Sequence, residues 1–176
     1  MTPSVRQPTL RTLLFAIGVV VSWYGMMAVH ELGHVAHGVL SGGRVERVSF
    51  PILGFSRTDV DPDPHPLFVA WGGVAWGVFL PVSVFGALQW LRRPMRRPAR
   101  FFAGFCLVAN GAYLAGGAIY PVGDAEVMVL LGTPRWVLVG VGLPCLIAGL
   151  WLWHRMARRD GVSRHAPFAQ PEKPKR

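Results

Sequence analysis

The sequence HELGH at residues 30–34 stands at the end of a long apolar run, and the rest of the chain is interpreted from it. His30 and His34 are four residues apart, so on a helix they share one face about 6 Å apart along the axis, close enough to hold one zinc ion. Glu31 can take a proton from a water on the open position of that metal. Ionisable residues at membrane depth are costly unless they pair or bind something. The motif therefore predicts a zinc site; the alternative is that the histidines only hydrogen-bond across a helical bundle.

The composition is typical of a membrane protein rather than a soluble one. Of the 176 residues, 52% are hydrophobic and only 15% are charged. The net charge of +9 raises the question of nucleic acid, but the basic residues fall between and beyond the apolar runs, so no nucleic-acid partner is expected. Cys106 and Cys145 lie inside apolar runs, and we expect small apolar side chains rather than a disulfide or a zinc site.

Four apolar runs predict an all-α membrane protein with four transmembrane helices, at about residues 12–40, 67–91, 101–122 and 136–153. A signal peptide is the alternative for the first run. That run is too long, however, and no small-residue cleavage site follows it. Residues 1–153 are therefore expected to form one integral membrane domain, and residues 154–176 a basic, disordered tail.

Between the first two runs, residues 44–66 mix apolar and charged side chains and are rich in proline, which predicts a short β-hairpin with a turn near 51–54. In the second run, Gly73 and Gly77 have the GxxxG spacing that permits close helix approach. In the middle of the third run, Asn110 is expected to hydrogen-bond between helices.

Lysine and arginine are distributed unevenly over the four-span topology. Fourteen of the 18 lie with the two termini and the 92–100 loop, and four lie on the other side. The positive-inside rule therefore predicts a multi-pass protein of the cell membrane with both termini in the cytosol. In this topology the first and third helices run the same way, and His34 and Asp124 lie at similar depth along them. Asp124 is thus expected to meet the two histidines as third zinc ligand, with water as the fourth.

Other carboxylates and histidines compete with Asp124 for this third position. Glu126 is one alternative and His37 the other, while Asp124 itself could be a helix-end carboxylate exposed to water. A ligand at His37 would stand seven residues after His30, about 10 Å along the helix axis, which is too far for easy chelation. We therefore expect His37 to support a ligand or line a pocket rather than to bind the metal.

These features together resemble the site-2 protease family of intramembrane zinc metalloproteases. The resemblance rests on HELGH at 30–34, on residues 42–50, which are like the family's small β element, on a glycine-rich second helix, and on Asp124 at the end of the third core helix. It covers most of residues 10–130. The family usually has Leu-Asp-Gly at the aspartate, where this chain has Gly-Asp-Ala, and the chain shows no PDZ or CBS domain. It would be a minimal, core-only member.

The resemblance implies an all-α membrane metalloprotease with one Zn²⁺ per chain. His30, His34 and Asp124 would be the zinc ligands and Glu31 the catalytic base, hydrolysing peptide bonds in or near membrane-spanning substrates. The expected partners are a membrane-protein substrate and the lipid bilayer, with the oligomeric state left open. The main alternative is a non-hydrolytic membrane scaffold or regulator that keeps the protease-like fold. A metal transporter ranks last, because few other polar groups line a path through the helices.

Overall fold

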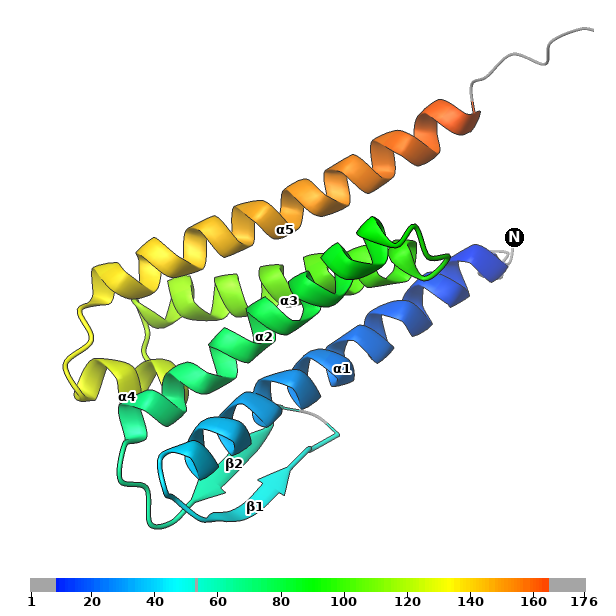
Figure 1. Cartoon of the computed structure of the whole chain (residues 1–176). Helices are drawn as coiled ribbons and strands as arrows, with labels where there is room; N and C mark the ends of the chain where they lie inside the picture. The colour runs from blue at the N-terminus through cyan, green and yellow to red at the C-terminus, as the bar shows by residue number, and fades with distance from the viewer. Residues whose placement is uncertain (1–8, 53, 165–176) are drawn as a thin grey trace, which may run out of the picture.

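The computed structural model describes residues 9–52 and 54–164, without the side chains of residues 11 and 159–164. In this part of the chain the elements are α1 (Leu10–Leu40), β1 (Val45–Ser49), β2 (Arg57–Val60), α2 (Pro66–Trp90), α3 (Arg96–Gly117), α4 (Asp124–Leu130) and α5 (Arg135–Arg164). The four long helices run side by side, and α4 lies at one end of them (Figure 1). The fold is therefore mostly helical with a small antiparallel sheet, as the sequence predicts.

Three helical segments of the described chain are long and apolar enough to cross a membrane: Thr12–Leu40, Pro66–Trp90 and Arg135–Arg158. The third predicted span, 101–122, is not among them. Its helix, α3, begins inside the arginine-rich loop and already ends at Gly117, so its uncharged part is short. The helix lies between α2 and α5, and buried residues occur along its length (Figure 1).

The C-terminal helix extends further than the sequence suggests. A disordered tail is predicted from His154, but α5 continues to Arg164, so residues 154–164 are helical. Good helix formers such as arginine, methionine and alanine fill the start of this extension. The Arg155 guanidinium also lies 4.2 Å from the centre of the Trp151 ring, one turn earlier. The remainder of the predicted tail, 165–176, lies outside the described residues.

The predicted hairpin is formed by β1 and β2, which pair antiparallel and lie beside the C-terminal half of α1 (Figure 1). At its tip, the Tyr24 hydroxyl donates to the carbonyl of Ile52 at 3.0 Å. At its base, Gly38 faces Val60 so closely that a Cβ there would stand 3.1 Å from a Val60 methyl group. The hairpin is therefore attached to α1 at both ends. Leu53, in the predicted turn, lies outside the described residues.

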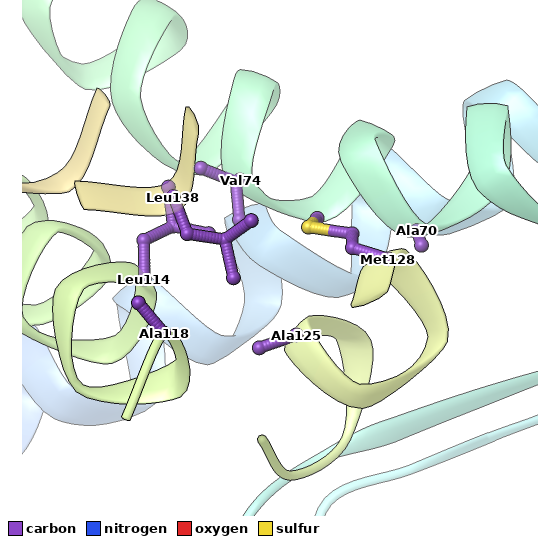
Figure 2. Close-up of a cluster of buried hydrophobic side chains, with 7 residues drawn as sticks. All are labelled: Ala70, Val74, Leu114, Ala118, Ala125, Met128 and Leu138. Carbon is purple, nitrogen blue, oxygen red and sulfur yellow. The ribbon is translucent and has the colours of Figure 1, made fainter. Parts of the chain in front are cut away.

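The short helix α4 is held by a buried apolar cluster that draws on four helices. Figure 2 shows its members, Ala70, Val74, Leu114, Ala118, Ala125, Met128 and Leu138. Met128 of α4 is fully buried within this cluster. Truncating such a side chain to alanine typically costs 2–5 kcal/mol. Asp124 is the first residue of α4, so this cluster determines where its carboxylate lies. The aspartate thus opens a separate helix, after α3 has ended.

Candidate metal centre

Three side-chain atoms from α1 and α4 converge on one point. The Nε2 atoms of His30 and His34 are 3.1 Å apart, and Oδ2 of Asp124 lies 2.9 Å from the first and 3.2 Å from the second. In a tetrahedral zinc site with bonds of about 2.0–2.1 Å, neighbouring ligand atoms are about 3.3 Å apart. The triangle of ligand atoms therefore has nearly the size that zinc requires. The structure brings together the three residues that the sequence proposes as ligands.

The outer nitrogens of both imidazoles determine which nitrogen faces the centre. Nδ1 of His34 lies 2.8 Å from the carbonyl oxygen of Val69, which can only accept, so this nitrogen carries the hydrogen. The amide nitrogen of Asn110 donates to the carbonyl of Cys106, which leaves its Oδ1 as the acceptor for Nδ1 of His30 at 3.1 Å. In its neutral form, each ring therefore presents its Nε2 lone pair to the centre, as hydrogen-bonded zinc ligands do.

Three lone-pair atoms at this separation repel one another, so either a proton on a ring nitrogen or a bound cation has to lie between them. Burial alone would raise the pKa of Asp124, but the contacts with His30 and His34 outweigh it and hold this pKa well below its usual range. Asp124 is therefore a carboxylate near neutral pH. Two imidazole lone pairs and one carboxylate are a donor set that suits a divalent zinc ion.

Glu31 stands beside this triangle, with only 2% of its surface exposed. Ligand-type atoms of His30, Glu31 and His34 all lie within 4.8 Å of one another, and the three residues form a group that could hold a metal ion. The hydroxyl of Thr58 on β2 donates to Oε2 of Glu31 at 2.6 Å. The base predicted from the motif is thus buried, close to the ligand atoms and held by the hairpin.

Glycines of α2 leave the space that these side chains occupy. A Cβ on Gly73 would lie 2.6 Å from Nε2 of His30 and closer still to Nε2 of His34. A Cβ on Gly77 would lie 2.8 Å from the amide of Asn110. The GxxxG pair therefore makes room for the two candidate ligands and for Asn110, the hydrogen-bond partner of His30, which is a more specific role than close helix approach alone.

Tyr113 on α3 is a residue of the site that the sequence analysis does not identify. Its hydroxyl accepts from the backbone nitrogen of Asp124 at 2.8 Å and donates to the carbonyl of Val122 at 2.9 Å. Between them, Gly123 has φ +56, and a Cβ there would lie 2.8 Å from the Tyr113 oxygen. The hydroxyl thus holds the turn that presents the carboxylate. The sequence signal that could identify Tyr113 is its position in an apolar run, because a buried tyrosine hydroxyl needs a hydrogen-bond partner.

The competing ligand candidates lie apart from the centre. His37 donates from Nδ1 to the carbonyl of Phe68 at 2.8 Å and stacks on that ring, with centroids 4.2 Å apart. Glu126 is exposed on α4. Asn110 joins α3 to α1 as expected, and its partner is a candidate ligand, His30. The two cysteines are free, as predicted.

The site combines three atoms that could bind a metal ion with the buried carboxylate of Glu31, which accepts a hydrogen bond from Thr58. Such an arrangement can activate water and move its proton. No family model, curated protein or solved structure matches this chain. What the site does chemically is therefore inferred from its own side chains.

Proposed function

We propose that this chain is an intramembrane zinc metalloprotease of the site-2 protease type, with His30, His34 and Asp124 as zinc ligands. The observation that carries the proposal is the triangle of Nε2, Nε2 and Oδ2 atoms 2.9–3.2 Å apart, with both Nδ1 atoms occupied by carbonyl acceptors. A buried glutamate beside that triangle supports a hydrolytic site over one that only stores metal, because its carboxylate can take a proton from water.

When bound, zinc would polarise the scissile carbonyl and lower the pKa of the attacking water. Glu31 takes the proton of that water and later delivers it to the nitrogen of the leaving amine. Asn110 and the carbonyl of Val69 keep the two imidazoles in the tautomer that leaves Nε2 free. Tyr113 keeps the Asp124 carboxylate in place. A substrate helix must be locally unwound first, because its carbonyls are otherwise hydrogen-bonded within the helix.

We propose further that α3 crosses the membrane as a fourth helix, enclosed by its neighbours, and that both termini are cytosolic. The start of α1, the arginine-rich connection before α3 and the end of α5 all lie at one end of the bundle, whereas the hairpin and α4 lie toward the other (Figure 1). The segments that carry most of the lysines and arginines therefore share one end, and this supports a cytosolic position for that end by the positive-inside rule.

Metal content tests the ligands. Wild-type protein purified in detergent should contain about one zinc per chain by mass spectrometry, and His34→Ala and Asp124→Ala should lose it. The matched control is His65→Ala, because His65 is exposed outside the site. Zinc that survives without Asp124 would move the third ligand to Glu31, which forms a possible metal-binding group with both histidines. Wild type without zinc would contradict the proposal.

Cleavage tests the chemistry. The probe is a labelled single-span peptide whose helix is interrupted by proline and glycine, reconstituted with the protein in liposomes. Glu31→Gln should keep its zinc and lower kcat by about 10²- to 10⁴-fold, the range that a general base contributes. Full cleavage by this variant would refute the role of the base. A zinc-loaded wild type that leaves the peptide intact would favour the non-hydrolytic scaffold.

A further inference from the structure

The hairpin contacts α1 at three positions spaced by seven residues. Tyr24 bonds Ile52 at the tip, and Gly38 receives Val60 at the base. Midway between them is Glu31. Residues seven apart lie on almost the same face of a helix, because two turns take 7.2 residues. The hairpin therefore lies lengthwise on the face of α1 that carries the candidate base, and the base is covered by it.

At this middle position, a single hydroxyl joins the two elements. Thr58 donates to Oε2 of Glu31 at 2.6 Å, the short distance expected for a hydroxyl on a carboxylate. Among the described residues, it is the one side-chain hydrogen bond that this carboxylate accepts, and no buried side-chain nitrogen or oxygen there lacks a partner. Threonine is stiff at χ1 in a strand, so the donor keeps its direction. Loss of this donor would leave a buried carboxylate under-satisfied.

We propose that Thr58 is the positioning residue of the general base, and that the rate of hydrolysis depends on the hairpin being seated on α1. The inference rests on the proposed function, because it assigns a role to Glu31. Thr58 orients one carboxylate oxygen through its hydroxyl, and it touches neither the metal ligands nor the scissile bond. Seating is provided by the contacts at Tyr24 and Gly38, which lie outside the chemistry.

The experiment compares Thr58→Val, which has the same shape without the donor, with Thr58→Ser, which restores the donor. The control is Ser49→Ala, because the Ser49 hydroxyl bonds only to the carbonyl of Arg57 within the hairpin. Using the interrupted single-span peptide, we expect kcat of Thr58→Val to fall about 10- to 100-fold, as for a misplaced catalytic group, with KM and zinc content unchanged. Thr58→Ser should recover most of the rate and Ser49→Ala should equal wild type. Equal kcat for Thr58→Val and wild type would overturn the inference and leave the protease proposal standing.

A second measurement does not need activity. Hydrogen exchange of the β2 amides reports how firmly the hairpin is seated. Glu31→Ala and Thr58→Val should each speed exchange in 57–60, and the double variant should exchange no faster than either single one, because both remove the same bond. Additive effects of the two substitutions on exchange would overturn the inference, whether or not the wild type cleaves the peptide. Absence of cleavage with non-additive exchange would count only against the proposed function.

Discussion

Two helix crossings in this molecule use glycine for different purposes. Where α3 meets α5, a Cβ on Gly149 would lie 2.7 Å from the carbonyl oxygen of Gly104, so these glycines let two backbones touch. Where α1 meets α2, Gly33 approaches the backbone of Gly72 in the same way. One residue further, however, Gly73 faces two imidazole nitrogens instead of a backbone. The glycines between α3 and α5 only allow close packing, whereas those between α1 and α2 also leave space for the two imidazole rings.

The role of a small residue between membrane helices therefore depends on which atoms lie opposite it. Small residues at such interfaces ordinarily favour close packing, and removing them costs stability. At Gly73 the atoms opposite are the Nε2 atoms of the two candidate ligands, so a side chain there should disturb metal binding before it disturbs the fold. Substitutions that add one methyl group at each position separate these two roles.

The largest effect is expected for Gly73→Ala. The added methyl group would overlap Nε2 of both His30 and His34, so zinc affinity should fall by more than the roughly 10–100-fold that loss of an outer hydrogen bond costs. Competition with a chelator measures the affinity, and far-ultraviolet circular dichroism should show unchanged helix content. Zinc affinity equal to wild type would mean that the ligands do not meet beneath Gly73.

The next largest effect on zinc affinity is expected for Tyr113→Phe in α3. Without its hydroxyl, the turn before Asp124 loses both hydrogen bonds, and zinc should bind about 10–100-fold more weakly. Tyr120→Phe is the matched control, because Tyr120 is exposed. If chelator competition gives the two variants the same affinity, the turn presents its carboxylate without help from the hydroxyl.

Where α3 meets α5, a substitution is expected to lower stability and leave zinc affinity unchanged. In Gly149→Ala the new methyl group would lie 2.7 Å from the Gly104 carbonyl oxygen and 2.9 Å from the backbone nitrogen of Val108, neither of which can move cheaply. Overpacking of this kind costs about 1–3 kcal/mol, so denaturant titration should show a less stable protein. Zinc affinity should remain that of wild type, because α5 carries no ligand. A loss of zinc would show that the two crossings are coupled.

The smallest effect is expected for Gly140→Ala on α5. Apart from neighbouring atoms of its own helix, no atom of the described residues lies within 4 Å of the position that a Cβ would take there. Removing a flexible glycine from a helix interior stabilises it by about 0.5–1 kcal/mol, so the denaturation midpoint should stay the same or rise slightly. A marked decrease in stability would indicate that another helix or chain packs against this face.

Features that lie within one helix could be predicted from the sequence. The HELGH spacing places His30, Glu31 and His34 on adjacent faces of α1 whatever surrounds them. Run lengths predicted the long helices, and alternation with turn residues predicted the hairpin. Equal depth along parallel helices was enough to propose Asp124 as the partner of the histidines.

Other contacts between elements could not be predicted, because they depend on how each helix is rotated about its own axis. Nothing local to Thr58 indicates that it bonds Glu31, and nothing local to Tyr113 indicates that it holds Asp124. The helix α4 is too short for periodicity to identify, and tertiary packing of Met128 stabilises it. The extension of α5 beyond His154 was missed because charge was read as disorder, although arginine also favours helix.

Asn110 and Tyr113 stand three residues apart on α3, and each holds a different candidate ligand, His30 on α1 and Asp124 on α4. If α3 slid along its axis by one residue, about 1.5 Å, both contacts would break together. A metal ion bound by both candidate ligands would therefore help to fix the axial position of α3. The resistance of α3 to sliding should therefore increase with the fraction of molecules that hold the metal. Pulling on this helix in a single-molecule experiment should then require more force when the ion is present.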